Sequence, residues 1–230
     1  MRKMLLAMCG LFAVAFGFIA INSTVNAGNQ EFAEKFADHN IINQTADQSG
    51  TFNFDKAHSF IGFRIKHYGL IEVPGYFRDF TGTVNYDAKD VTKSTVEFTA
   101  KMTSVDTGVP PRDEHLRKPD FFEVEKYPDM TFKSTKVAKN GNQLAVTGDF
   151  TMKGVTKSIT IPFNIAGVIP NRGGLKMGLT AETVINRRDY GVNYGETKPG
   201  ETPTLADDVK VVLQIEANKA APKPAGAPAE

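Results

Sequence analysis

The sequence has few residues that could hold a fold together by covalent or metal bonds. Its 230 residues include one cysteine and no tryptophan. A lone cysteine forms no internal disulfide and no cysteine-rich metal site. An excess of charge of one sign is also absent, because 27 basic side chains balance 26 acidic ones. This balance argues against a nucleic-acid-binding protein, which usually presents a basic stripe, and against a polybasic membrane-surface protein.

Motifs for catalysis and metal binding are equally scarce. The chain has no G-x-S-x-G elbow and no H-E-x-x-H helix, and the glycine pair 173–174 lacks the lysine of a phosphate-binding loop. The histidines at positions 39, 58, 67 and 115 lie in different segments, so the sequence defines no local set of metal ligands. We therefore expect no metal, no cofactor and no catalytic residue.

One long hydrophobic run stands at the start of the chain. A short basic region precedes residues 4–21, which contain no charged side chain, and Val25 and Ala27 then fit the two small-residue positions of a signal peptidase site. We interpret residues 1–27 as a cleaved signal peptide and expect a periplasmic protein with no stable membrane span. The alternative is an uncleaved anchor, although the run is short for one. Cleavage also removes Cys9, which leaves a cysteine-free chain suited to an oxidising compartment.

The rest of the chain alternates apolar and polar side chains with a period of two. Residues 28–50 form a polar N-terminal extension and residues 218–230 an Ala/Pro-rich tail that we expect to be disordered, so the domain spans residues 51–217. Eight stretches read as half-buried strands: 61–65, 80–86, 96–102, 130–132, 144–152, 159–165, 175–181 and 209–215. Turn pairs such as Asn140-Gly141 and Lys153-Gly154 predict antiparallel neighbours. The fold class is therefore all-β, and alternation alone leaves a sandwich and a barrel open.

Residues 106–128 break this alternation. Pro110 and Pro111 precede a charged run, which suits the start of a helix, and Asp120 with Glu123 has the spacing of a capping box. We expect one or two short helical turns here that close one end of the strand array. Loops of this length in compact domains are usually functional.

Phenylalanine and methionine are the abundant large apolar residues. Of 17 phenylalanines, 12 lie between Phe52 and Phe163. Their side chains form a smooth, adaptable wall that carries no polar group, which suits a flexible hydrocarbon ligand and suits a plain core equally well. Composition alone leaves both interpretations open.

A set of spaced motifs closely resembles the YceI-like family and covers residues 51–217. The matching elements are His58-Ser59, Phe63, His67, Gly75, Phe77, Ser104-Val105-Asp106-Thr107, Arg112-Asp113, His115-Leu116-Arg117, Asp120-Phe121-Phe122, Lys126-Tyr127-Pro128, Thr131-Phe132, Ser134-Thr135, Gly148-Asp149-Phe150-Thr151, Gly154-Val155-Thr156-Lys157, Asn186-Arg187 and Asp189-Tyr190-Gly191. The resemblance implies an extended, lipocalin-like, eight-stranded antiparallel barrel. Its interior would bind a polyisoprenoid or a similar amphiphile, such as an isoprenoid quinone or a fatty-acid derivative. Family members are commonly homodimers and are not established enzymes.

We expect a lipid-binding site with an apolar lining and a polar mouth. The predicted lining residues are Ile61, Phe63, Ile65, Phe98, Met102, Phe121, Phe122, Met130, Phe132, Phe150, Met152 and Phe163. The candidates for contacting or gating a polar head group are His58, Arg112, Asp113, His115 and Arg187. A structural role is the alternative for these residues, in which a salt bridge between Arg187 and Asp189 on one strand face seals a barrel end.

The leading hypothesis is a secreted binding protein that sequesters or carries a long lipid without transforming it. One alternative is an enzyme acting on such a lipid, with His115 or His58 as the base. Another is an envelope stress or interaction module whose barrel is packed solid. The choice depends on whether the interior contains a cavity and on which polar groups border it.

Overall fold

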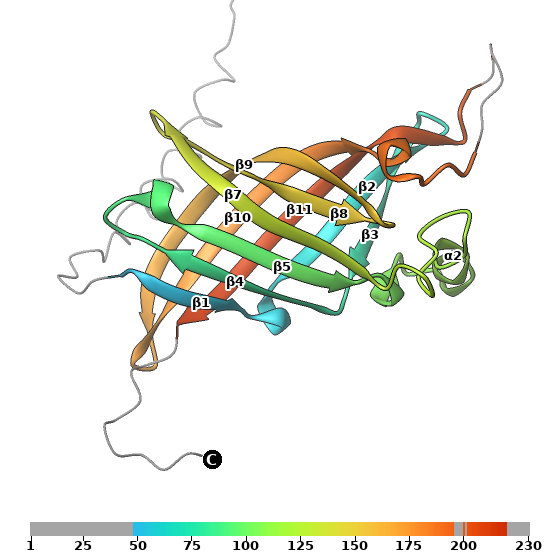
Figure 1. Ribbon diagram of the computed structural model, residues 1–230. Helices are drawn as coiled ribbons and strands as arrows, with labels where there is room; N and C mark the ends of the chain where they lie inside the picture. Colours follow the sequence, from blue (N-terminus) through green and yellow to red (C-terminus); the bar gives the residue numbers. More distant parts are fainter. Residues whose placement is uncertain (1–47, 196–199, 201, 220–230) are drawn as a thin grey trace, which may run out of the picture. The chain divides into compact units, whose positions relative to one another are not determined.

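The computed structural model describes residues 48–195, 200 and 202–219, which form strands with a few short helical segments (Figure 1). The strands are β1 (Gly50–Phe54), β2 (Phe60–His67), β3 (Ile71–Phe77), β4 (Phe80–Tyr86), β5 (Thr95–Lys101), β6 (Val105–Asp106), β7 (Asp129–Asn140), β8 (Gln143–Met152), β9 (Val155–Asn171), β10 (Gly174–Asn186) and β11 (Leu205–Lys219). The helical segments are η1 (Lys56–His58), η2 (Val91–Lys93), η3 (Met102–Ser104), α2 (Pro110–Leu116) and η4 (Arg187–Tyr190). The predicted signal peptide, residues 1–27, lies outside the described residues.

The labelled strands close into an eight-stranded antiparallel barrel, because six of them join in pairs to form three bent strands. β1 and β2 are separated only by η1 and together form one bent strand. β3 and β4 follow each other in the same way and form a second bent strand beside the first, because β4 pairs with β1 and β3 pairs with β2. β5 and β6 form a third bent strand, because β5 pairs with β4 and β6 pairs with β3. The five remaining strands, β7 to β11, follow in sequence order, and β11 pairs with both β1 and β2 to complete the ring. The predicted eight-stranded barrel is confirmed, and the sandwich is excluded.

The three bent strands break at the same level of the wall, along a line that we call the crease (residues 56–58, 78–79 and 102–104). Hydrogen bonds join the breaks: the Arg78 amide donates to the Ser104 carbonyl (3.1 Å), and the Lys101 amide donates to the Asp79 carbonyl (2.8 Å). Lys56 Nζ also donates to Asp79 Oδ1 (2.5 Å). The two backbone bonds satisfy groups that lose their ladder partners at the bend, and the Lys56–Asp79 bond joins two side chains across it.

The eight predicted strands correspond to β2, β4, β5 and β7 to β11, whereas β1, β3 and β6 were not predicted. β3 contains Pro74, which cannot donate to a ladder; the strand tolerates it because β6 covers only Tyr76 and Phe77. β6 has two residues, too few for a periodic pattern. The strands also extend past the predicted ends of the domain: β1 begins at Gly50, and β11 includes Asn218 and Lys219 of the predicted tail.

The turn between β8 and β9 has the expected chemistry. Lys153 and Gly154 connect the strands as a two-residue hairpin, and both have positive φ angles, 49° and 76°. A type I′ turn requires this geometry, whose twist matches that of the flanking strands.

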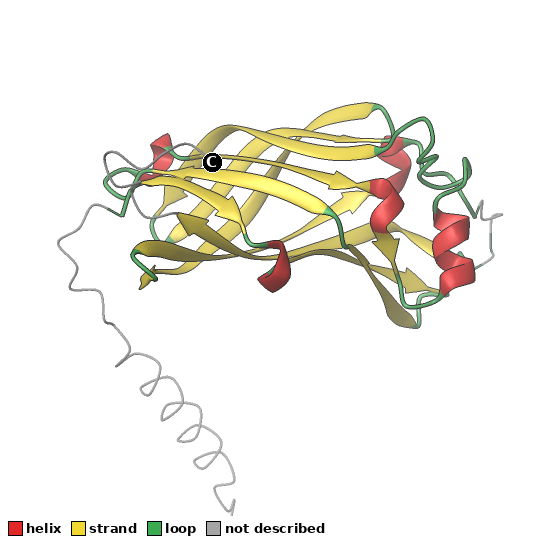
Figure 2. Ribbon diagram, turned by 90° about the horizontal axis from the view of Figure 1, so that it is seen from below, coloured by secondary structure: helices red, strands yellow, loops and turns green. Residues whose placement is uncertain are grey.

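Helix α2 covers one end of the barrel (Figure 2). It begins at Pro110, as predicted, because proline at the first helical position needs no amide donor. Arg117 connects the helix to the wall by donating to the Thr103 and Val105 carbonyls (2.9 and 3.0 Å). The predicted capping box is wrong: Glu123 has a φ of 52°, which no helix accepts, and Asp120 bonds to His115 instead. Within the described residues, no helix is long and apolar enough to cross a membrane.

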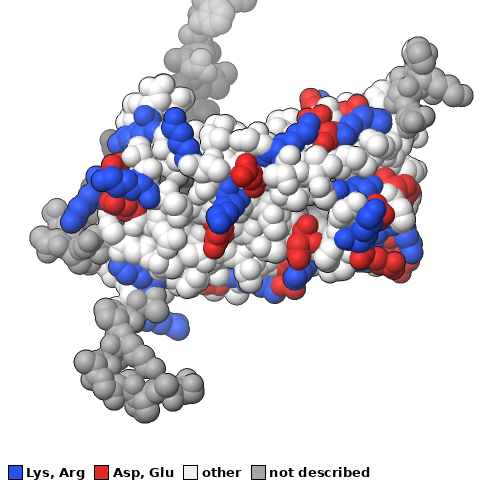
Figure 3. Space-filling view, in the orientation of Figure 1, with Lys and Arg blue, Asp and Glu red and all other residues white. Residues whose placement is uncertain are grey.

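Charged side chains are interspersed over the barrel face seen in Figure 3. Basic and acidic groups lie beside one another there. The described residues include ion pairs such as Lys157–Asp189 (3.0 Å) and Lys101–Asp129 (2.8 Å). Mixed signs of this kind create no extended field of one sign over this face.

Candidate functional site

The barrel interior contains two neighbouring cavities. The wide cavity, about 310 Å³, lies at the end covered by α2, and the narrow cavity, about 90 Å³, lies beyond it between β1, β4 and the middle of β7 to β11. Ile61 and Phe98 border both cavities. The Phe98 ring stacks on Phe132, with 5.8 Å between centroids and 21° between planes. These side chains therefore form a constriction between two chambers, and the interior is not packed solid.

The narrow cavity is a hydrocarbon environment. Strand alternation places Val84, Val146, Ile161 and Leu213 on its wall, and the first half of β10 contributes the buried Met177. The surface that these residues present to the cavity is apolar. A ligand group that reaches this chamber must therefore be apolar, because a polar group would lose its hydration without gaining a partner.

Cationic and imidazole side chains border the wide cavity and not the narrow one. They are His67, Arg112, His115 and Arg187. They come from β2, from α2 and from η4, three elements that end at this side of the barrel. The interior thus has an apolar inner chamber and an outer chamber with a polar border.

Eleven of the twelve predicted lining residues border the cavities. Seven border the wide cavity, two border the narrow cavity, and Ile61 and Phe98 border both. The first group is Phe63, Ile65, Phe121, Phe122, Met130, Phe150 and Met152, and the second is Phe132 and Phe163. The exception is Met102, which is buried but borders neither cavity. The alternation of β5 ends at Lys101, and Met102 begins η3, so strand alternation no longer determines which side of the wall its side chain occupies.

Arg112 presents a positive charge to the wide cavity. Its Nε donates to Thr107 Oγ1 (2.7 Å) and its Nη2 to the Thr107 carbonyl (2.9 Å). In the part of the chain that the structure describes, Arg112 has no ion pair. Asp113 does not neutralise it, because that buried carboxylate accepts hydrogen bonds from the amide and hydroxyl of Thr107 (2.8 and 2.5 Å). Asp113 therefore fixes the loop that positions Arg112 and does not border the cavity itself.

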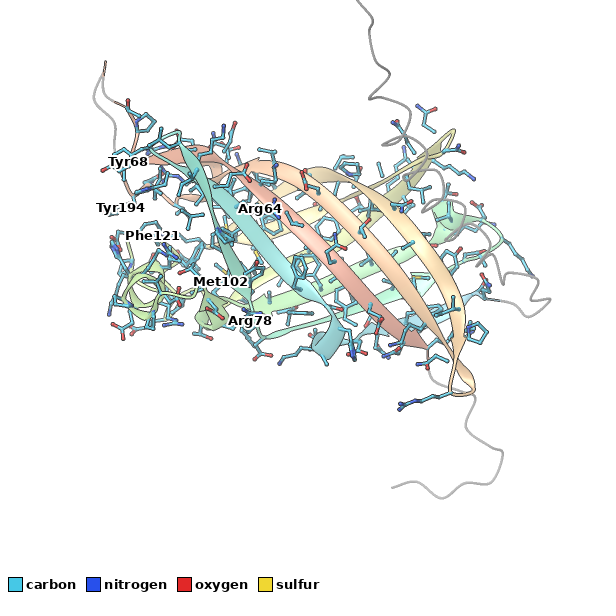
Figure 4. The ribbon with its side chains drawn as sticks, turned by 180° about the vertical axis from the view of Figure 1, so that it is seen from behind. Arg64, Tyr68, Arg78, Met102, Phe121 and Tyr194 are labelled. Carbon is cyan, nitrogen blue, oxygen red and sulfur yellow. The ribbon has the colours of Figure 1, made fainter. Side chains whose placement is uncertain are left out.

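His115 lies within an aromatic cluster at the mouth. Its ring is edge-on to Phe121 (4.9 Å between centroids) and to Tyr194 (5.1 Å), and Tyr194 stacks on Phe121 (4.5 Å). Its Nε2 lies 2.6 Å from Asp120 Oδ2. Figure 4 shows Tyr194 and Phe121 at the same end of the barrel, with Tyr68 nearby. These rings form one side of the opening.

Arg187 is buried, with 3% of its surface exposed. It donates to the Ala206 and Val192 carbonyls (2.9 and 2.7 Å) and pairs with Asp207 (3.0 Å). Burial, and then the neighbouring Arg188 charge, lower the pKa of this guanidinium from its ordinary value, while Asp207 opposes the shift. The predicted partner, Asp189, is wrong, because η4 ends the strand alternation and turns Asp189 toward Lys157.

His58 lies apart from the other candidates, in η1 at the crease. Its Nδ1 is 2.9 Å from Asp55 Oδ2 and 3.6 Å from Glu216 Oε1. These three residues have the composition of a metal site. However, Lys176 pairs with Glu216 and lies 3.8 Å from Asp55, so its ammonium group already supplies the cation. The hydrogen bond from His58 is the largest cause that lowers the pKa of Asp55 to about 2. These side chains form what we call the closure cluster (Asp55, His58, Lys176 and Glu216), which fastens β1 and β10 to β11.

Several lining residues were missed by the sequence analysis. The segment between η4 and the first residue of β11 contributes four residues to the border of the wide cavity: Val192, Tyr194, Thr204 and Leu205. That segment has no periodicity, so the sequence contains no signal for which of its side chains point inward. Leu116 was missed for a related reason, since a helix of seven residues has too few turns to define a face.

Comparison with known proteins agrees with this geometry. Residues 52–217 match the YceI-like domain, a segment that contains most of the barrel wall and α2. The chain belongs to the YceI-like family. It is 42% identical over 160 residues to the protein YceI of Escherichia coli O157:H7, covering 69% of this chain and 81% of the relative. It is 37% identical over 153 residues to the UPF0312 protein plu2095 of Photorhabdus laumondii, covering 65% of this YceI-like chain and 80% of the relative.

Solved structures share the fold of this YceI-like protein. A Campylobacter jejuni YCEI protein matches with a TM-score of 0.60 at 34% identity, covering 72% of this chain and 96% of that one. Burkholderia cenocepacia BcnA matches with a TM-score of 0.61 at 25% identity, covering 71% and 98%. A polyisoprenoid-binding domain from Saccharophagus degradans matches with a TM-score of 0.53, covering 74% and 98%. Its identity of 16% supports the shared fold alone.

Proposed function

We propose that the protein is a secreted, periplasmic binding protein that holds one long-chain amphiphilic lipid, such as a polyisoprenoid, an isoprenoid quinone or a fatty-acid derivative. The observation that supports this proposal is the polarity gradient of the interior. The inner chamber is apolar, and cationic side chains border only the outer chamber. A lipid would enter tail first, with its tail beyond Phe98 and its head group near Arg112.

The energetics favour a chain over a compact ligand. Each CH₂ group moved from water to an apolar site contributes about 0.8 kcal/mol, so an isoprene unit of five carbons contributes about 4 kcal/mol before the cost of ordering it. Arg112 can donate to a phosphate, a carboxylate or a quinone carbonyl, because its charge has no acidic partner among the described residues. Arg187 is committed to Asp207 and backbone carbonyls, which supports a structural role in holding the rim.

Binding without chemistry is the function that the polar groups favour. In the described chain, His115 is hydrogen-bonded only to Asp120, and neither contacts a serine hydroxyl that could act as a nucleophile. His58 borders neither cavity and is bonded within the closure cluster. The two histidines considered as bases therefore lack the serine nucleophile of a Ser-His-Asp hydrolase.

The test is extraction of the natively purified protein followed by mass spectrometry. We expect one hydrophobic compound per barrel, with an unmodified chain. Val211→Phe should reduce its amount, because Val211 borders the wide cavity and a larger side chain would occupy the space of the ligand. Val184→Phe is the matched control, since Val184 lies exposed on the neighbouring strand β10. Empty wild-type protein that also takes up no fluorescent fatty-acid probe would refute the proposal.

A further inference from the structure

The turn between β2 and β3 exposes three large apolar side chains within four residues. Tyr68, Leu70 and Ile71 are 48%, 83% and 64% exposed. We call them the apolar tip. Single exposed apolar residues are ordinary on protein surfaces, but a group of this kind at the end of a hairpin marks an interaction site.

The apolar tip lies at the mouth of the wide cavity. His67, the last residue of β2, borders the cavity, and its ring contacts that of Tyr68 with 4.6 Å between centroids. The Tyr68 amide donates to the carbonyl of Thr204, another cavity residue (2.9 Å). Figure 4 shows Tyr68 and Tyr194 at the same end of the barrel. A ligand that leaves the wide cavity therefore passes beside the tip.

The backbone of the turn does not require these side chains. Tyr68 and Gly69 have φ angles of 50° and 68°, and the Leu70 amide donates to the His67 carbonyl (3.0 Å), which defines a tight turn of the primed class. Asparagine or glycine would adopt the Tyr68 conformation with less strain, and a polar residue would be better hydrated at position 70. The sequence here fits a contact surface better than it fits an isolated turn.

We propose that the apolar tip inserts into the surface of a lipid bilayer, so that the wide cavity opens toward the acyl chains and exchanges its lipid there. A projecting tip suits a bilayer, which deforms around it, whereas a protein partner would need a matching groove. Tyrosine rings favour the head-group layer, and the exposed Lys66, which has no ion pair in the described part of the chain, can contact anionic lipid phosphates. The docking is independent of the ligand; only the exchange rests on the proposed function.

The test is sedimentation of the natively purified protein with vesicles of phosphatidylethanolamine and phosphatidylglycerol at three to one. Leu70→Ser with Ile71→Ser should weaken vesicle binding by tenfold or more, because both side chains lose their apolar burial. Ile169→Ser is the matched control, as Ile169 is 53% exposed on β9 near the opposite hairpin. The control should bind vesicles as the wild type does.

A second measurement separates docking from ligand binding. A fluorescent fatty-acid probe delivered from cyclodextrin should bind the double variant and the wild type with equal affinity, whereas its transfer from vesicles should be slower by tenfold for the variant. Equal vesicle binding of all three proteins would overturn the proposal. The proposal would also be overturned if the wild-type protein does not bind vesicles but forms dimers that the double variant does not form, because the tip would then contact a second copy of the chain. Failure of probe binding in every protein would instead count against the proposed function, with vesicle sedimentation still deciding the docking.

Discussion

Replacing Phe98 by tryptophan should shorten the longest lipid chain that the barrel accepts. Phe98 borders both cavities and stacks on Phe132, so a larger ring at this position narrows the passage between the chambers. Chains that end within the wide cavity should bind the variant and the wild type equally. Chains that extend into the narrow cavity should lose their additional affinity.

The size of this loss in affinity depends on how many CH₂ groups of the lipid chain lie in the narrow cavity. Burial of one CH₂ group contributes about 0.8 kcal/mol, which corresponds to a factor of about four in affinity. A chain with four CH₂ groups beyond Phe98 would therefore lose about 3 kcal/mol, or about 200-fold, before correction for the cost of ordering the chain. A loss of about sixfold remains measurable if ordering offsets two thirds of that energy.

The assay is displacement of a fluorescent fatty-acid probe by a series of carboxylic acids of increasing length. For the wild type, affinity should rise along the whole series; for Phe98→Trp it should stop rising at a shorter chain. Phe60→Trp is the control, because Phe60 packs against Tyr76 and borders neither cavity. Identical length dependence in the wild type and Phe98→Trp would refute the two-chamber reasoning. Thermal unfolding checks that both variants fold, since overpacking costs about 1–3 kcal/mol.

Two further predictions concern acid stability and the glycines of the wall. The pKa of Asp55 is lowered to about 2 in the folded protein, so the ionised carboxylate stabilises the fold at any pH above the pKa that Asp55 has in the unfolded chain. This stability should be lost as the pH falls from about 4 toward 2. Asp55→Asn should reduce the slope of unfolding free energy against pH in that window; an unchanged slope would show that Asp55 does not contribute. Gly75→Ala should weaken probe binding, because its Cβ would lie 2.2 Å from the Phe63 ring and displace that ring, which borders the wide cavity, whereas Gly167→Ala meets no atom within 4 Å and should bind normally.

The strands that alternate regularly were predictable because one face of each is buried. β8 shows this most clearly, where Val146, Gly148, Phe150 and Met152 are buried and every second residue between them is more exposed. The same alternation predicted most of the cavity lining. It failed at Met102, where a turn interrupts the strand, and it gave no information on Tyr194, which lies in a loop. Strand periodicity describes a face of a sheet and ends where the sheet does.

The polar contacts were less predictable than the lining. The partner of Arg187 is Asp207, which lies 20 positions away on the next strand, rather than the neighbouring Asp189. His58 was predicted to contact a lipid head group at the barrel mouth because it is a histidine, but it lies in the closure cluster with Glu216. In both cases the partner depends on strand pairing across the barrel. A single sequence shows the candidates for a charge pair but not the register that brings two of them together.

The pairing of β11 sets the order in which the barrel can be completed during synthesis. Most strands pair with the strand that precedes or follows them, but β11 joins β10 to both β1 and β2, and Asn218 bonds to Asp55 at a separation of 163 positions. Until the ribosome has produced this last strand, β10 and the first bent strand are open edges that can pair with other chains. An incomplete chain is therefore exposed to aggregation. It also has no enclosed interior, so a lipid can be retained only after the entire barrel sequence has emerged and β11 has docked.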